Sequence, residues 1–372
     1  MSHQVQIDYK HIACQCNTVC NMAEQRLKEL DEMLSQIENT ATRLLNDQAE
    51  SLKVAIVREK ESLIKQIKVV RDKADEDAKM GVVRTNNHDA RYAHRDDTIN
   101  AAKNLEDMVN TFSSQKLIEF QSLLDNLLKE SSNDAYRKLL ERTNGNVTID
   151  EQTQKILNSI QDEVLRQFTY LAYIKDNTLS GDSLIKAGKE LMEESLNSTY
   201  ESRMAFEEER IRKELEAARV DKDIISKVVS KKEGTAKERL SQMQAQATTE
   251  VIGETVRQQS LKVIMKAVAD RGFIVDKKNI KINRETNEVH MVAMKASGER
   301  ADFKIYMDGK FIYDFHHGYK GQACQKDIEP FMKDLEEVYG IHVTKSQEIW
   351  SNPDKISTMK YQAMNTNKNK GW

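Results

Sequence analysis

The sequence predicts a mainly α-helical protein, in which long amphipathic helices of the coiled-coil type precede a small C-terminal α+β domain with an antiparallel sheet. Only two of its 372 residues are proline, Pro330 and Pro353, so no earlier position loses a backbone donor to this residue type. Charged residues make up 31% of the chain and hydrophobic residues 39%, which argues against one large core. Apolar residues recur at steps of three and four up to about residue 271 and alternate only afterwards.

The first expected helical region covers residues 22 to 78. Its apolar residues form a seam typical of a coiled coil: Leu27, Leu30, Leu34, Ile37, Ala41, Leu44, Leu52, Ile56, Leu63, Ile67, Val70 and Ala74. The register slips between Leu45 and Ile56, so we expect a local unwinding or a short antiparallel hairpin there. The polar stretch from Gly81 to Asp97 predicts a bend or loop.

Four more amphipathic helices are expected, at residues 99 to 142, 150 to 177, from 183 onward, and 236 to 271. Asn144-Gly145-Asn146 predicts the end of the first, and Thr148 with Glu151 forms a capping box that starts the second. Opposite charges interleave between residues 207 and 216, which predicts a solvated helix stiffened by weak ion pairs. Polar members of the last seam, such as Gln244, would fix register and partner number at a cost in stability.

The pattern changes to that of a sheet after Gly272. Strands are expected at residues 273–282, 288–296, 301–307 and 310–315, a helix at 322–339 and a short strand at 341–344. The chain then divides into an N-terminal segment (1–21), a coiled-coil or helical-hairpin region (22–142), a helical region with a charged helix (148–235), a connecting long helix with the α+β domain (236–350), and a disordered tail (351–372).

Composition also bears on the class of protein. A net charge of -3 with interleaved signs gives no basic field, so charge does not support nucleic-acid binding. No apolar run approaches the length of a membrane span and the first residues do not resemble a signal peptide, which predicts a cytoplasmic protein. A phosphate-binding loop is absent, so we do not expect the chain itself to be an ATPase, and no cofactor is expected.

Three clusters invite comparison with metal sites. Cys14, Cys16 and Cys20 follow His11, but a structural zinc site usually takes a second ligand pair from another segment, so thiols near a helix start are the preferred interpretation. His88-Asp89 and the run from His94 to Asp97 are six residues apart, which does not place two ligands on one helical face. We interpret this segment as a polar loop or hinge.

An enzymatic hypothesis rests on Asp302-Phe303-Lys304, on an expected strand. Restriction-type nucleases place an acid and a lysine in this spacing on one strand, the acid to hold Mg²⁺ and the lysine to polarise water. A second metal-binding acid would have to come from Glu288 or Asp276. The alternative is the solvated polar face of a half-buried sheet, which the sequence favours.

A candidate binding site follows at the next strand and helix. Asp314, His316 and His317 precede Gly318 and Gly321, and Cys324 lies in the first turn of the expected helix. A glycine-flanked helix start offers backbone N–H groups to an anion and would lower the pKa of a nearby thiol. Binding of a ligand or partner, a nucleophilic cysteine with a histidine base, and a tight turn with Cys324 packed inside remain alternatives.

One segment resembles a known group of proteins. The run with Asp308-Gly309, Tyr313, Gly318, Gly321, Cys324 and Asp327 resembles small uncharacterised bacterial domains associated with gene clusters of AAA-type ATPases. The resemblance covers under a fifth of the chain and does not extend to the long helices. It implies an accessory or adaptor role.

Together these patterns favour a non-catalytic assembly or adaptor protein over an enzyme. Its helices would form a homo-oligomeric coiled coil, or hold an α+β domain that binds a protein partner such as an ATPase. The alternatives are a metal-dependent nuclease centred on Asp302 and Lys304, and an accessory subunit of an AAA-type ATPase in DNA maintenance or defence.

Overall fold

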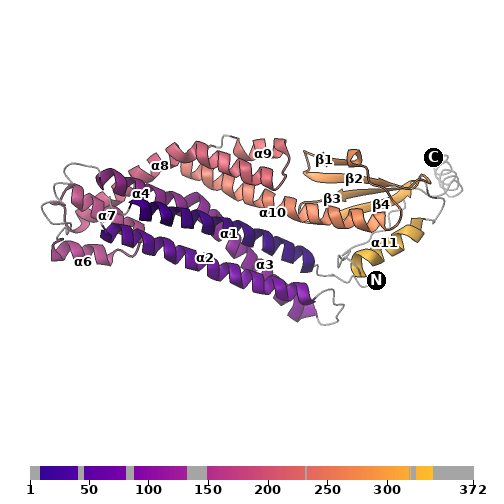
Figure 1. Cartoon of the computed structure of the whole chain (residues 1–372), viewed down its shortest axis with the longest axis horizontal. Helices are drawn as coiled ribbons and strands as arrows, with labels where there is room; N and C mark the ends of the chain where they lie inside the picture. Colours follow the sequence, from indigo (N-terminus) through magenta and orange to yellow (C-terminus); the bar gives the residue numbers. More distant parts are fainter. Residues whose placement is uncertain are drawn as a thin grey trace, which may run out of the picture. The chain divides into compact units, whose positions relative to one another are not determined.

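The computed structural model of the chain describes residues 9–40, 46–80, 88–131, 149–230, 233–317, 319 and 324–337 (Figure 1). The helices are α1 (Tyr9–Thr40), α2 (Asn46–Met80), α3 (His88–Thr111), a π-helical turn (Phe112–Lys116), α4 (Leu117–Ser131), α6 (Glu151–Ser159), α7 (Glu163–Lys175), α8 (Gly181–Ala217), α9 (Lys222–Val229), α10 (Ala236–Ala269), a 3₁₀ turn (Lys277–Asn279) and α11 (Gln325–Glu337). The strands are β1 (Ile280–Asn283), β2 (Glu288–Met294), β3 (Arg300–Ile305) and β4 (Phe311–His317). These elements confirm the predicted fold class.

The chain divides into two compact units. The helical unit comprises Val19–Arg71 and Asn100–Thr249, and the sheet unit comprises Met1–Thr18, Asp72–Ile99 and Glu250–Trp372. Helices α1, α2, α3 and α10 each contribute residues to both units. No helix in the described ranges is long and apolar enough to span a membrane.

In the helical unit, α1 and α2 run antiparallel. The Cys20 thiol donates to the backbone oxygen of Ile67 at 3.8 Å, and Lys60 Nζ lies 2.5 Å from Asp31 Oδ1 at the other end of the pair. The predicted seam is the contact surface, since Leu30, Ile37, Leu52, Ile56, Leu63 and Val70 are buried. Helices α1 and α2 thus form an antiparallel hairpin, which was one of the two expectations for residues 22 to 78.

Helices α7 and α8 pack closely because α8 has a glycine where they meet. A Cβ atom on the buried Gly188 would lie 2.3 Å from Thr169 Oγ1 and 2.6 Å from Thr169 Cα. Backbone atoms of α7 therefore occupy the space that any larger residue would need.

We expect Gly188→Ala to destabilise the protein by about 1–3 kcal/mol, because α7 and α8 must separate to admit the methyl group. The sign of the stability change distinguishes a crowded position from an open one. At an unhindered helical position, alanine is more favourable than glycine by about 0.5–1 kcal/mol. Urea unfolding of this variant and of Ser202→Ala, at an exposed position of the same helix, checks the expectation. Unchanged or greater stability of the Gly188→Ala protein would show that the two helices do not meet there.

The sheet is an antiparallel meander with strand order β1-β2-β3-β4. Its inner face carries the alternating apolar residues that the sequence predicted, such as Met291, Phe303 and Phe315, which pack with Ile264 of α10 and Phe331 of α11. Phe303, Phe315 and Phe331 lie within 6 Å of one another, ring centre to ring centre. Helices α10 and α11 thus cover one face of the sheet (Figure 1).

Two hairpin turns attach the sheet to α10. Arg257 of α10 is buried and its Nη1 donates to the backbone oxygen of Asn287 at 2.8 Å and to Asn287 Oδ1 at 3.0 Å, in the turn between β1 and β2. At the turn between β3 and β4, Ser260 lies 3.4 Å from the backbone oxygen of Gly309, which takes the left-handed conformation expected for an Asp-Gly turn (φ +79°). The second part of α10 and the sheet therefore form one body.

Several expected boundaries are wrong. Helix α3 begins at His88, so the segment from His88 to Asp97 is not a loop; its polar residues contact α2 instead, with His94 Nε2 2.8 Å from Asp77 Oδ1. The helix expected at residues 150–177 is interrupted because Asp162 accepts from the N–H groups of Val164 and Leu165 and starts a new helix. Asp150 accepts from the N–H of Thr153 in the first turn of α6, and Thr148 lies outside the described residues.

Other expectations concern residues outside the described ranges. These are the helix end at Asn144-Gly145-Asn146, the strand at 341–344 and the tail at 351–372.

Candidate interaction surfaces

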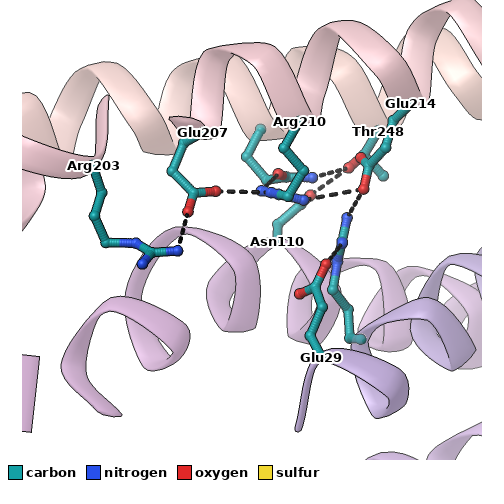
Figure 2. A network of polar contacts seen from close by, with 9 residues as sticks. Glu29, Asn110, Arg203, Glu207, Arg210, Glu214 and Thr248 are labelled. Carbon is teal, nitrogen blue, oxygen red and sulfur yellow. Dashed lines mark hydrogen bonds and ion pairs between the residues drawn. The ribbon is translucent and has the colours of Figure 1, made fainter. Parts of the chain in front are cut away.

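A polar cluster of the helical unit is buried between helices α1, α3, α8 and α10. Figure 2 shows Glu207 and Arg210 of α8 at its centre, with Arg210 Nε 2.8 Å from Glu207 Oε2 and Arg210 Nη1 3.0 Å from Glu214 Oε1. Arg26 of α1 bonds both Glu214 and Glu29. The side chains of Arg26 and Glu207 are 1% and 0% exposed, so the predicted solvated helix is wrong on this face.

The network is balanced in charge and connects helices that are far apart in sequence. Arg210 Nη2 also donates to Gln244 of α10 at 2.9 Å, and Thr248 of α10 donates to Asn110 of α3 at 2.6 Å. Burial alone would lower the pKa of Arg210, but the carboxylates of Glu207, Glu214 and Glu29 more than offset it, so the pKa is raised. Because Arg26, Arg203 and Arg210 each have carboxylate partners, we assign the network to the architecture of the bundle rather than to a ligand.

The outer face of the sheet carries the predicted nuclease residues. Lys304 lies in a cross-strand row with Lys281, His290 and Ile312, whereas Asp302 lies in the next row, opposite Val292 and Asp314. Arg300 Nη2 is 2.6 Å from Asp302 Oδ1. Asp302 and Lys304 therefore share a face, as the spacing predicted.

Neither of the predicted second acids lies beside Asp302 to complete a metal site. Glu288 Oε1 lies 2.7 Å from His290 Nε2 and 4.0 Å from Lys304 Nζ, and the bond with His290 lowers the pKa of Glu288. Glu288 is four residues along β2 from the position opposite Asp302, which is about 13 Å at the rise of a strand. Asp276 instead accepts from the N–H of Lys278.

The described side chains of this sheet face therefore do not form a set of metal ligands. Within the described residues, no three histidine, cysteine, aspartate or glutamate side chains form a group suited to a metal ion. Asp302 and Lys304 instead belong to a half-exposed polar sheet face that also exposes the apolar side chains of Ile274, Met294 and Ile312.

The predicted binding turn is described only in part. Asp314 lies on the outer face of β4, the backbone of His316 and His317 continues that strand, and Gly318 and Gly321 lie outside the described residues. Cys324 packs against the apolar core. Tyr319 donates to Asp327 at 2.6 Å, and Lys295 lies 2.6 Å from the same carboxylate oxygen, so the described part of this turn is tied to the sheet.

The three N-terminal cysteines lie on α1. Cys16 and Cys20 lie one helical turn apart in α1 and are buried, and Cys14 points to another side of the helix. Burial raises the pKa of the Cys20 thiol, which disfavours the thiolate form that nucleophilic and metal-binding cysteines use. His11 bonds Ser260 at 2.6 Å.

Sequence reasoning missed a second apolar surface on α2. Val54, Val57 and Ile64 are 46%, 41% and 46% exposed, whereas the seam residues Ile56 and Leu63 are fully buried. With Glu61 and Lys68 these residues follow steps of three and four along the helix, and we call the five positions the outer stripe of α2. The signal was present in the sequence, because Val54, Val57 and Ile64 do not fit the seam that contains Leu52, Ile56 and Leu63.

Comparisons with known proteins add no functional information: no protein-family model, curated protein or solved structure matches the chain.

Proposed function

We propose that the protein is a non-catalytic assembly protein, in which the outer stripe of α2 joins copies of the chain and the C-terminal sheet offers its open face to a protein partner. The observation that carries the proposal is the second apolar surface of α2. One face of this helix already packs in the core through Leu52, Ile56, Leu63 and Ile67. Three β-branched side chains on another face are not needed for that packing.

The spacing of these side chains supports a helical partner. Val57 and Ile64 are seven residues apart, and Val54 precedes Val57 by three, which are the intervals of the a and d positions of a coiled coil. An isolated exposed apolar residue needs no explanation, but Val54, Val57 and Ile64 lie on one side of the helix. The outer stripe is short and contains two charged positions, so we expect association in the weak, transient class of interfaces.

The sheet unit supports the adaptor part of the proposal. Its sheet is fixed to the part of α10 that belongs to this unit by a shared core and by Arg257, so a partner bound to the sheet would be held on a rigid support. The open face exposes Ile312 and Met294 among charged residues. The resemblance of this region to domains from gene clusters of AAA-type ATPases leads us to propose such an ATPase as the partner.

We expect the double substitution Val57→Lys/Ile64→Lys to abolish self-association, because it places four additional positive charges in an interface between two copies. Sedimentation equilibrium at protein concentrations from about 5 to 300 µM covers the expected range, with dissociation constants of about 10 µM or weaker. The wild-type mass should rise with concentration, and that of the variant should stay at the monomer value of 42.8 kDa.

The matched control is Phe206→Lys/Ile312→Lys, which makes the same chemical change at two other exposed apolar residues. It should associate as the wild type does. If the control dissociates and the α2 variant does not, the copies meet elsewhere and the proposal fails.

A further inference from the structure

We infer that two copies of the chain pair through the outer stripe of α2 in an antiparallel arrangement, with Val54 of one copy against Ile64 of the other. This inference rests on the proposed self-association and adds its direction and register. It is drawn from the charges that interrupt the stripe. In heptad terms Val54, Glu61 and Lys68 are a positions, and Glu50, Val57 and Ile64 are d positions.

A parallel pairing in register brings each position against itself. Glu50, Glu61 and Lys68 would then each face the same residue of the other copy, which places like charges together in three layers of the interface. Like charges at facing helical positions are destabilising and oppose complex formation. Glu50, Glu61 and Lys68 are all exposed, so none of them is withdrawn into the core of its own chain.

An antiparallel pairing brings a positions against d positions, and the register can then be chosen by charge. When Val54 of one copy faces Ile64 of the other, Glu50 faces Lys68 and Val57 faces Glu61, each twice by symmetry. Arg58 follows Val57 at the edge of the stripe and is exposed, so it lies within reach of the facing Glu61. Opposite charges thus meet at both ends of the contact, Val54 and Ile64 meet next to them, and Val57 faces Glu61 in the two central layers.

The two neighbouring antiparallel registers have less favourable contacts between the facing side chains. Moving one copy by a heptad in one direction sets Val54 against Val57 but brings Glu50 against Glu61. Moving it in the other direction sets Val57 against Lys68 and Ile64 against Glu61, so no apolar pair remains. Like charges therefore disfavour the first of these registers, and the loss of apolar contact disfavours the second.

The charges and apolar residues of the stripe indicate that its partner is a second copy of the chain. An unrelated partner would need an apolar pair flanked by a basic residue at one end and an acidic residue at the other. The outer stripe, together with Glu50 one turn before it, meets this requirement when it is reversed, because the acidic Glu50 and the basic Lys68 lie at opposite ends. A self-complementary patch of this kind is what a two-fold symmetric interface needs.

Charge reversal tests the direction. Glu50→Lys should weaken association about tenfold, because it faces Lys68 twice in the antiparallel dimer, and Glu50→Lys/Lys68→Glu should restore the wild-type dissociation constant to within about threefold. In a parallel dimer both variants keep like charges face to face, so neither would change association in this way. Equal dissociation constants for all three proteins overturn the antiparallel inference.

Cross-linking gives a second readout. Glu50→Cys and Lys68→Cys proteins, one of them carrying a tag that changes its mass, are mixed at about 200 µM and treated with a short bismaleimide. The wild type, in which Cys16 and Cys20 are buried, serves as the blank for the native thiols.

The antiparallel dimer yields mainly the mixed product, and the parallel dimer yields mainly the two homodimers. If association persists in Val57→Lys/Ile64→Lys, the proposed interface has failed. If that variant is monomeric but homodimers dominate the cross-linked products, only the direction is wrong.

Discussion

Replacement of Arg210 by methionine is expected to destabilise the helical unit by about 3 kcal/mol, because it removes the central cation of the buried network. Glu207 is fully buried and would keep only Arg203, whose Nη2 is 3.4 Å away. Glu214 would keep Arg26. A carboxylate left in a buried site with fewer partners costs more than the original ion pair contributes.

Urea unfolding followed by circular dichroism measures this effect. Lys213→Met is the matched control, since Lys213 lies one turn away, is 71% exposed and pairs only weakly with Glu209; its effect should stay within about 0.5 kcal/mol. The double variant Arg210→Met/Glu207→Leu should recover part of the loss, because it removes the stranded carboxylate as well. If Arg210→Met is as stable as the control, the network is not buried as described.

Replacement of Arg257 by methionine is expected to cost about 3 kcal/mol in the stability of the sheet unit. The side chain is 1% exposed, and its guanidinium bonds Glu254 as well as the backbone and side chain of Asn287. Methionine fills a similar volume but leaves the carbonyl of Asn287 and the carboxylate of Glu254 without this donor. The turn between β1 and β2 should then detach from α10 more often.

Hydrogen exchange followed by mass spectrometry locates the effect. Amides of β1 and β2 should exchange faster in Arg257→Met, while those of α7 and α8 should not change, because they belong to the other unit. Lys262→Met, at an exposed position of α10, should leave exchange unaltered. Uniform acceleration across both units, or none, would contradict the role given to Arg257.

The C-terminal fold could be predicted because its signals are local. Alternation of Phe303 and Ile305 with charged residues indicates one buried face, and Asp308-Gly309 is a turn sequence whose glycine adopts the expected conformation. The same local reasoning placed Asp302 and Lys304 on one face. It could not place Glu288, because the distance between residues on different strands depends on pairing register, which the sequence does not state.

The presence of long helices could be predicted from the sequence, but the contacts between these helices could not. Glu207, Arg210 and Glu214 have the spacing of a solvated charged helix, and the same spacing serves a buried network when other helices supply Arg26 and Gln244. Charges on His94 and Asp97 suggested a loop, yet contacts with Asp77 and Lys73 stabilise a helix there. In each case a tertiary contact outweighs the local preference.

The outer stripe of α2 shows the opposite situation, in which the sequence held a usable signal. A helix that packs on one side needs one seam, and α2 has apolar residues for two. Val54, Val57 and Ile64 are exposed only because Leu52, Ile56 and Leu63 already satisfy the packing of the chain on itself. A pair of seams on one helix predicts a contact beyond the single chain.

The most direct test of the account is the mass of the unmodified protein in solution as a function of its concentration. Sedimentation equilibrium should give a mass that rises from 42.8 kDa toward twice that value, and that falls back when Val57 and Ile64 are replaced by lysine. A wild-type mass that stays at 42.8 kDa up to about 300 µM, well above the weak dissociation constants expected for a small interface, would contradict self-assembly through α2.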